Sequence, residues 1–287
     1  MKVLVTGVTG QLGHDCVNEF MERGIAVRGV SSKDFSLTDG PAVKKYIKEY
    51  GPDVVLHGAA YTAVDKAEDE QELCMAVNAE GTRYIAEACA EIGAKMIYIS
   101  TDYVFPGDGD VPYDVTAEKG PRNVYGRSKL KGEEAVQELL TKYFIVRISW
   151  VFGINGKNFV RTMLNLAKNH KELTVVGDQI GSPTYTRDLA VLLADMAKSE
   201  KYGIYHATNE GFCSWAEFAG EVFRQAGKEV QVTPVDSAAY PTKAVRPHNS
   251  RMSKEKLLQA GFRPLPRWED AVGRYLIELQ NESTLLG

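Results

Sequence analysis

The sequence predicts a doubly wound α/β fold, with a parallel sheet covered by helices on both faces, followed by a smaller C-terminal α/β lobe. Two observations support this prediction. Short apolar runs alternate with amphipathic segments through the first 150 residues, which is typical of βαβ units. A glycine-rich turn separates the first apolar run from the first amphipathic segment, as it does in dinucleotide-binding Rossmann folds.

Each apolar run predicts a strand, and each amphipathic segment between two runs predicts a helix. Gly24, Gly51 and Gly93 follow three of these helices at positions where helices commonly end. The strands are expected at residues 2–6, 25–30, 53–57, 95–100 and 144–148, and the helices at residues 11–23, 42–50, 72–92 and 124–141.

After Trp150 the segments become shorter, and glycine and proline interrupt them more often. This change predicts a dinucleotide-binding domain over residues 1–150. Residues 151–287 are then mainly a substrate-binding lobe, with segments that return to the Rossmann domain.

The charge balance argues against nucleic acid as a partner. Lys and Arg total 34 against 38 Asp and Glu, a net charge of −4, so no basic field is present to bind a phosphate backbone. The first apolar run is only three residues long, Val3–Leu4–Val5, and no run approaches membrane-spanning length. No membrane association is therefore expected.

The four cysteines are far apart and form no pattern with one another or with histidine. Neither a disulfide framework nor a zinc site is predicted, and a reducing, cytoplasmic location fits best. The acidic stretch at residues 65–72 is expected to be a solvated loop and helix start.

The glycine-rich turn predicts a phosphate-binding site. Gly7, Gly10 and Gly13, with Gln11 and Leu12 at the start of the helix, place backbone N–H groups where a dinucleotide pyrophosphate binds. The spacing differs by one residue from G-x-G-x-x-G. The alternative is a tight turn that only packs a helix closely against the sheet.

The tip of the second strand indicates which cofactor is used. NAD sites commonly carry a carboxylate there, whereas this sequence offers Arg28, Ser31 and Ser32, which suit a 2′-phosphate. NADPH is therefore favoured, and NADH remains possible because Asp34 is within reach of the ribose. A plain solvent-facing loop is the alternative.

Tyr125 and Lys129 lie four residues apart in a predicted helix, so they share one face. A phenol with a pKa of about 10 needs a nearby cation to act as an acid–base group at neutral pH, and Lys129 supplies one. Thr101 ends the fourth strand, at the same edge of the sheet as the glycine turn. The alternatives are a surface tyrosine over a lysine stem and an ordinary strand-end hydroxyl.

Together these elements resemble the extended short-chain dehydrogenase/reductase family. The resemblance implies that Thr101, Tyr125 and Lys129 are catalytic, with Tyr125 as the proton donor and Lys129 also holding the nicotinamide ribose. It extends the expected cofactor contacts to Leu37, Ala59, Ala60 and Tyr61. The motifs that carry it are Thr6-Gly7-x-x-Gly10-x-x-Gly13, Ser100-Thr101-Asp102-Tyr103-Val104-Phe105 and Tyr125-x-x-x-Lys129.

Further runs narrow the resemblance to the branch that reduces dTDP-4-dehydro-β-L-rhamnose at C4 to dTDP-L-rhamnose. It implies that Val64, Asp102 and Trp150 border the deoxysugar, and that Asn158 and Arg246 hold the dTDP part. The runs lie at residues 59–68, 123–129, 147–153, 156–160, 178–184 and 246–251.

Two other functions remain open from the sequence. One is the reduction of another dTDP-4-keto-6-deoxysugar, because pocket shape decides stereochemistry. The other is a noncatalytic, NADP-binding regulatory subunit of methionine adenosyltransferase, which a similar family branch provides.

The sequence also departs from the family. Some members place a metal between glutamates at a dimer contact, but this chain has Asp15 in the first helix and ends Asn281-Glu282-Ser283-Thr284-Leu285-Leu286-Gly287, so no metal is expected. The usual acidic residue after the second strand is replaced by Ser36. A monomer or weak homodimer is expected.

Overall fold

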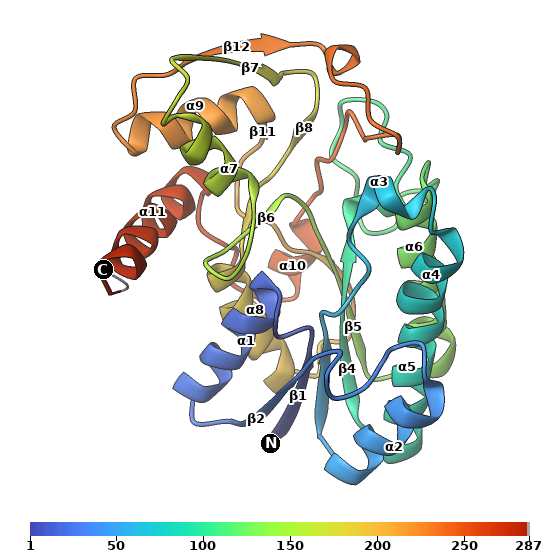
Figure 1. Ribbon diagram of the computed structural model, residues 1–287. Coiled ribbons are helices and arrows are strands. Elements are labelled where there is room, and N and C mark those ends of the chain that lie inside the picture. Colours follow the sequence, from blue (N-terminus) through green and yellow to red (C-terminus); the bar gives the residue numbers. More distant parts are fainter. Residues whose placement is uncertain (286–287) are drawn as a thin grey trace.

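A computed structural model describes residues 1–285 of the chain, so Leu286 and Gly287 of the C-terminal sequence lie outside the described residues. Its centre is a six-stranded parallel sheet in the order β10-β5-β4-β3-β1-β2 (Figure 1). The predicted α/β fold class is confirmed. The strands are β1 (Lys2–Thr6), β2 (Ala26–Val30), β3 (Val54–His57), β4 (Lys95–Thr101), β5 (Tyr143–Ile148) and β10 (Gly203–His206).

Helices cover both faces of the sheet. On one face α1 (Gln11–Glu22) packs against α8 (Thr186–Lys198), and on the other α2 (Gly40–Tyr50) packs against α5 (Gly81–Ile92), which contacts α6 (Val124–Leu139). Alternate residues of β1 enter the two cores, with Val3 and Val5 on the α1 side and Leu4 on the α5 side. Burial of both faces explains why the strands are continuous apolar runs.

The helix expected over residues 72–92 is divided into three parts. A short helix α4 (Gln71–Met75) and one turn of π-helix (Ala76–Glu80) precede α5. Asn78, in the π turn, accepts from the backbone N–H of Tyr61 at 2.7 Å and donates to Ser128 Oγ at 2.9 Å. These bonds tie the turn to the loop after β3 and to α6. Because they involve residues far away in the sequence, helical periodicity does not reveal the interruption.

The C-terminal lobe has its own core beside the carboxyl edge of the sheet. Its helices are α7 (Phe159–Leu166), α9 (Trp215–Gln225) and α11 (Trp268–Leu285). Phe152, Tyr185, Phe218 and Tyr275 pack in a cluster of stacked and edge-on rings at the centre of this core. Its strands form three small pairs: β6 (Val151–Phe152) with β9 (Thr184–Tyr185), β7 (Glu172–Val176) with β12 (Gln231–Val235), and β8 (Ile180–Gly181) with β11 (Cys213–Ser214).

Parts of the chain beyond residue 150 lie within the Rossmann layers. Helix α8 packs on α1, and β10 pairs in parallel with β5 at the edge of the sheet. Short helix α10 (Glu255–Gln259) contacts β10. The segment after β12, orange in Figure 1, crosses from the lobe towards α3 (Val64–Ala67). The roles predicted for residues 1–150 and 151–287 stay predictions.

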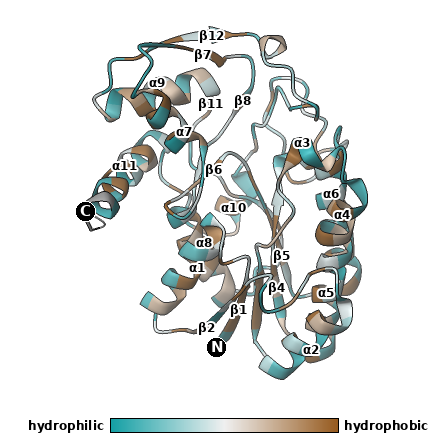
Figure 2. Ribbon diagram, viewed as in Figure 1, coloured by the Kyte–Doolittle hydropathy of each residue, from teal (hydrophilic) through white to brown (hydrophobic). Residues whose placement is uncertain are grey.

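Within residues 1–285, no helix is both long and apolar enough to cross a membrane. In Figure 2 the brown, apolar colouring concentrates on the strands of the sheet, while much of the outer helix surface is teal. The same described part of the chain has no group of three or more His, Cys, Asp or Glu side chains that could hold a metal ion.

A buried ion pair joins α6 to the sheet. Arg147 on β5 and Glu133 on α6 are 0% and 1% exposed, and two guanidinium nitrogens donate to the two carboxylate oxygens at 2.7 and 2.8 Å. Ser100 Oγ at the end of β4 also donates to Glu133, at 2.6 Å. Such a pair is stable only when its charges and hydrogen bonds are complete. It therefore fixes α6 relative to β4 and β5.

Replacing Glu133 by Gln is expected to lower the free energy of unfolding by about 3–5 kcal/mol, because the buried Arg147 charge is left without its counter-ion. Urea unfolding measures the change. Glu138→Gln on the same helix is the control: its pair with Arg83 is exposed, so a loss of less than about 1 kcal/mol is expected. Equal losses in the two variants would contradict the assigned role of the buried pair.

Candidate active site

The turn between β1 and α1 is closed by contacts that only glycine permits. Gly7 has a φ of +80°, and a Cβ there would lie 2.7 Å from the backbone nitrogen of Ala59. A Cβ on Gly13 would lie 2.3 Å from the carbonyl oxygen of Gly7. The turn therefore packs α1 tightly against the sheet, as the alternative interpretation held. Close packing and phosphate binding are compatible, because both need a bare backbone.

The N-terminus of α1 is prepared for an anion. Gly10 is its N-cap, no described side chain caps it, and its first turn carries no acidic residue. The positive end of the helix dipole is thus left to a ligand. Gly7, Gly10, Gln11, Leu12 and Gly13 all line one cavity at this point. A dinucleotide pyrophosphate fits this arrangement.

A cavity of about 370 Å³ extends from the glycine turn past the tip of β2. Besides Gly7 and Gly10, five further predicted cofactor contacts line it: Ser31, Ser32, Leu37, Ala59 and Ala60. The Asp34 carboxylate accepts from the backbone N–H of Ser31 at 2.8 Å and so closes the local turn. Ser31 and Ser32 line this cavity at the tip of β2, whereas Asp34 is not among its lining residues.

Two predicted cofactor residues do not line these cavities. The Arg28 guanidinium lies over the Tyr50 ring, 4.4 Å from its centroid, because strand alternation directs Arg28 towards α2. The Tyr61 hydroxyl donates to Glu70 Oε2 at 2.6 Å, and its ring packs beside Val124. The cofactor contacts predicted for Arg28 and Tyr61 stay predictions, with both side chains bonded or packed outside these cavities.

Gln11 and Asn158 bond to each other across the two parts of the chain. The Gln11 Oε1 atom accepts from Asn158 Nδ2 at 2.9 Å and from the backbone N–H of Gly153 at 2.8 Å. Asn158 also caps α7 by accepting from Arg161 N–H, and it donates to Tyr275 Oη. Asn158 lines none of the cavities described here, and its predicted contact with the dTDP part stays a prediction. Its bond to Gln11 attaches the lobe to the first turn of α1.

The predicted catalytic residues do meet. A second cavity of about 370 Å³ lies where the carboxyl ends of β4 and β5 meet the glycine turn. Thr101 comes from the end of β4, and Tyr125 and Lys129 come from one face of α6. Three further predicted residues, Val64, Asp102 and Trp150, line the same cavity.

Burial dominates the electrostatics of Tyr125. Removal from water raises the pKa of its phenol, the negative charge of Asp102 raises it further, and a hydrogen bond with Thr101 opposes both effects. The sequence led us to expect a pKa lowered by Lys129. That expectation is wrong for this structure, because desolvation has the larger effect and favours the protonated phenol.

Lys129 is also buried, with 3% of its surface exposed. Its ammonium nitrogen lies over the Tyr98 ring, 4.1 Å from the centroid. Burial lowers the pKa of Lys129 to about 7, although the charge of Glu133 acts in the opposite direction. The amine therefore changes its charge near neutral pH.

Asp102 forms the link between Thr101 and the lobe. Its carboxylate accepts from Thr101 Oγ1 at 3.0 Å and from Ser250 Oγ at 2.5 Å. Burial raises the pKa of Asp102 to about 6, and these two hydrogen bonds limit the rise. Ser250 was not among the residues expected at the site. It reaches Asp102 only because the segment after β12 folds back onto the sheet.

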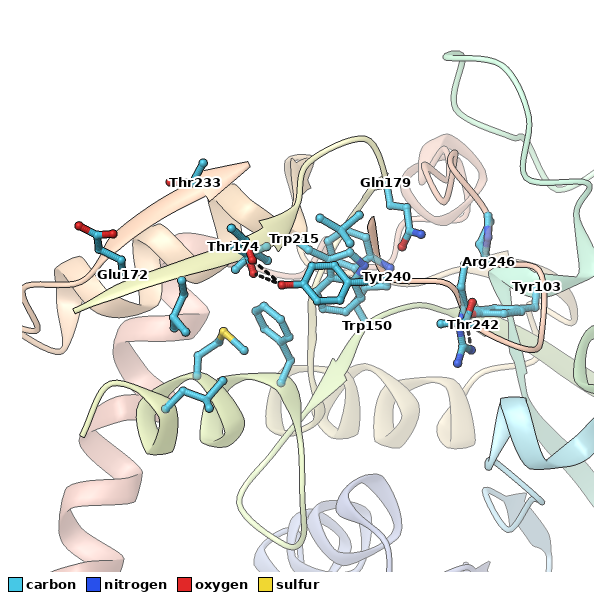
Figure 3. Close-up of a pocket in the computed structure, with 17 residues that line it drawn as sticks. Tyr103, Trp150, Glu172, Thr174, Gln179, Trp215, Thr233, Tyr240, Thr242 and Arg246 are labelled. Carbon is cyan, nitrogen blue, oxygen red and sulfur yellow. Dashed lines mark hydrogen bonds between the residues drawn. The ribbon is translucent and has the colours of Figure 1, made fainter. Parts of the chain in front are cut away.

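A larger cavity of about 840 Å³ lies in the lobe (Figure 3). Trp150 separates it from the catalytic cavity and lines both. The Trp150 ring stacks on Trp215 with centroids 3.7 Å apart, and Trp150 has a φ of +50°, which is uncommon for a bulky side chain. The sequence did not predict Trp215 as a residue of this cavity, because it reaches Trp150 from a distant segment of the chain.

Arg246 lies at the end of the lobe cavity nearest the sheet, close to Tyr103 in Figure 3. Its guanidinium donates to the Asp65 carboxylate and, at 3.1 Å, to the Tyr103 hydroxyl. The Tyr103 ring meets the Tyr125 ring edge-on at 5.5 Å. Residues 65–72 are thus only partly a solvated loop, because Asp65 pairs with Arg246 and Glu68 Oε1 accepts from the N–H of Val124.

The glycine-rich turn leads into a helix whose N-terminus has no side-chain cap, and it lies beside Thr101, Tyr125 and Lys129 at the carboxyl edge of a parallel sheet. This arrangement defines a nicotinamide-dependent oxidoreductase of the short-chain dehydrogenase/reductase class. Comparison with known proteins narrows this class. The chain belongs to the family described as the RmlD substrate binding domain, which matches residues 1–281.

The relatives agree with this assignment. A dTDP-4-dehydrorhamnose reductase of Streptomyces griseus is 44% identical over 276 residues, covering 94% of this chain and 91% of that protein. A crystal structure of the reductase from Clostridium acetobutylicum has a TM-score of 0.95 at 40% identity and covers 98% of this chain and 100% of its own. The crystal structure of the Bacillus anthracis reductase, in complex with NADP, has a TM-score of 0.94 at 43% identity. The match covers 97% of this chain and 100% of that chain.

The lowered pKa of Lys129 predicts a pH-dependent stability of the cofactor-free protein. Above pH 7 the folded amine is neutral while the unfolded amine keeps its proton, so the contribution of this group to stability rises with pH and is lost as pH falls through 7. The difference in unfolding free energy between Lys129→Met and wild type is expected to change by about 1 kcal/mol per pH unit between pH 7 and 8.5.

Urea unfolding at a series of pH values measures this difference. Lys131→Met is the control, because Lys131 is an exposed residue of the same helix, and its profile is expected to run parallel to wild type. A parallel profile for Lys129→Met as well would show that the amine titrates normally.

Proposed function

We propose that this protein reduces dTDP-4-dehydro-β-L-rhamnose at C4 to dTDP-L-rhamnose with NADPH, as a dTDP-4-dehydrorhamnose reductase. The observation that carries the proposal is the cavity that joins the glycine turn to Thr101, Tyr125 and Lys129. It opens beside a lobe cavity large enough for a nucleotide, with Trp150 between the two. The family and the named relatives support the same reaction.

Tyr125 is proposed as the proton donor. When bound, NADPH supplies a hydride to C4 of the sugar, and the oxygen on that carbon then needs a proton. The raised pKa of Tyr125 keeps its phenol protonated at neutral pH, which is the form that reduction requires. An alkoxide is a stronger base than a phenolate, so the transfer remains favourable. Lys129 lies one helical turn away, and in its protonated form, which is partly populated at a pKa of about 7, its charge stabilises the phenolate that results.

Thr101 is proposed to hold the substrate oxygen in line with Tyr125. Its hydroxyl now donates to Asp102, so it must turn away from Asp102 to donate to the substrate. The same carboxylate accepts from Ser250, which keeps it in place. Asp102, Val64 and Trp150 line the cavity and are proposed to border the deoxysugar. Lys129 is also proposed to hold the nicotinamide ribose.

On the cofactor side, Gly7, Gly10 and Gly13 are proposed to contact the pyrophosphate, with Gln11 and Leu12 contributing backbone N–H groups. Ser31 and Ser32 are proposed to bind the 2′-phosphate, and Leu37, Ala59 and Ala60 to enclose the adenosine. All of these residues line the two connected cavities along the carboxyl edge of the sheet.

The lobe cavity is proposed as the site of the dTDP moiety. Its walls carry aromatic rings for a base, including Phe159, Trp215 and Tyr240. Arg246 lies at its end nearest the catalytic cavity, where the diphosphate between nucleoside and sugar would lie. Residues 151–287 would then serve mainly as the substrate-binding part, and residues 1–150 as the cofactor-binding part.

The identity of the sugar is tested by the product. The purified protein is incubated with NADPH and dTDP-4-dehydro-β-L-rhamnose, and NMR of the product reports both turnover and configuration at C4. The rhamno configuration is expected. Turnover only with a different dTDP-4-keto-6-deoxysugar would replace the substrate but keep the chemistry, and no NADPH oxidation with any of them would reject the enzyme.

Tyr125→Phe is expected to lower kcat by about 100- to 10,000-fold, because the general acid is removed. The affinity for NADPH is expected to stay nearly unchanged, since the ring remains. Stopped-assay turnover and fluorescence titration of NADPH measure the two quantities. Tyr143→Phe, at the opposite end of β5 from the catalytic cavity, is the control and is expected to behave as wild type. Wild-type kcat in Tyr125→Phe would remove this residue from the mechanism.

Arg246→Ala is expected to raise KM for the nucleotide sugar, and the Ki of dTDP, by about 10- to 100-fold through loss of charge-assisted hydrogen bonds. Arg246→Lys is expected to recover only part of this loss, because an ammonium lacks the guanidinium fork. Arg224→Ala on the exposed face of α9 is the control. Unchanged constants in Arg246→Ala would place the diphosphate elsewhere.

A further inference from the structure

Asp65, on the short helix α3 of the Rossmann part, contacts the segment that crosses from the lobe. We propose that Asp65 is a positioning residue that holds the Arg246 guanidinium ready for the diphosphate of the nucleotide sugar. This inference rests on the proposed function of Arg246. It adds a residue that touches neither the substrate nor the cofactor and acts only through the arginine.

The contacts between the two segments converge on this pair. The Asp65 Oδ2 atom accepts from Arg246 Nη2, and its Oδ1 atom accepts from the backbone N–H of Ala244 at 3.0 Å. Asn123 Nδ2 donates to the carbonyl oxygen of Val245 at 2.9 Å. One carboxylate therefore fixes both the backbone of the crossing segment and the side chain that the segment delivers to the cavity.

The arginine keeps donors free for a ligand. A guanidinium has five N–H donors. Asp65 occupies a donor on Nη2, and Tyr103 Oη occupies a donor on Nη1. Because Arg246 also lines the lobe cavity, its remaining N–H groups are available to an anion there without breaking the bond to Asp65. The pair is thus a support for the arginine and not a competitor of the diphosphate.

The energetic effect is expected in binding and not in folding. The Asp65 and Arg246 side chains are 45% and 23% exposed, and ion pairs this accessible contribute little to stability. Holding a long side chain in its binding conformation removes an entropy cost from association. That saving corresponds to a factor of about 3 to 10 in affinity.

A neighbouring pair provides a comparison within the same two segments. Asp69 pairs with Lys243, so it also joins the loop after α3 to the crossing segment. Lys243 lines none of the cavities described in residues 1–285, and both side chains are more than half exposed. Loss of this pair removes a similar tether but leaves Arg246 and its partners in place.

Asp65→Asn is the informative variant. An asparagine Oδ1 still accepts from Ala244 N–H, so the backbone anchor is kept while the charge opposite Arg246 is lost. KM for the ketosugar nucleotide and Ki for dTDP are expected to rise about 3- to 10-fold. The Ki of thymidine, which has no phosphate, the kcat and the affinity for NADPH are expected to stay at wild-type values.

Two further variants complete the test. Asp65→Glu is expected to recover part of the dTDP affinity by restoring the charge, and Asp69→Asn is expected to match wild type throughout. Wild-type Ki for dTDP in Asp65→Asn, or an equal weakening of dTDP and thymidine, would overturn the positioning role. If wild type turned over no ketosugar, the proposed function would fail, whereas calorimetric titration with dTDP would still decide the role of Asp65.

Discussion

The close approach of α1 to the turn after β1 is the constraint on which the rest of the site depends. Gly13 allows it, because a side chain there would collide with the carbonyl oxygen of Gly7, and Gly7 in turn allows the turn to lie against the backbone of Ala59. The same approach leaves the N-terminus of α1 without a side-chain cap and therefore open to an anion. It also sets where the lobe attaches, since Gln11 accepts from Gly153 and Asn158, and Asn155 Nδ2 donates to the carbonyl oxygen of Thr9 at 3.1 Å. The glycine turn and the C-terminal lobe are thus positioned relative to the same first turn of α1.

Burial, more than proximity of charge, determines the protonation states of the ionisable groups that line the cavity at Thr101, Tyr125 and Lys129. It raises the pKa of Tyr125, lowers the pKa of Lys129 to about 7 and raises the pKa of Asp102 to about 6. All three shifts favour neutral groups, as expected where water is excluded. A protonated phenol suits a reductase, because the step that needs it is donation of a proton. The buried Glu133–Arg147 pair below Lys129 holds α6, and hence the tyrosine and lysine, against the sheet.

The two cavities are joined by residues that belong to both. Trp150 and Tyr103 line each of them, and Tyr103 contacts Arg246 on one side and Tyr125 on the other. The segment that carries Arg246 also carries Ser250, which donates to Asp102. Tyr103 therefore lines the lobe cavity and at the same time contacts the phenol ring of Tyr125 directly. This continuity gives a physical reason why one chain combines a Rossmann domain with an irregular lobe.

The sequence by itself predicted five of the six strands, the helices between them and the grouping of Thr101, Tyr125 and Lys129, because hydrophobic period, glycine spacing and helical spacing are local properties. Strand β10 and helix α8, which come from beyond residue 150, were not predicted. The π turn at Asn78, the direction of Arg28 towards Tyr50 and the bond between Gln11 and Asn158 were decided only by tertiary structure. The pairing of Asp65 with Arg246 and the stacking of Trp150 on Trp215 belong to the same group. Each joins segments that are separated in the chain, so their geometry depends on how the elements pack against one another. The pKa shifts of Tyr125, Lys129 and Asp102 were also decided only by tertiary structure, because desolvation depends on how the molecule packs and not on residue spacing.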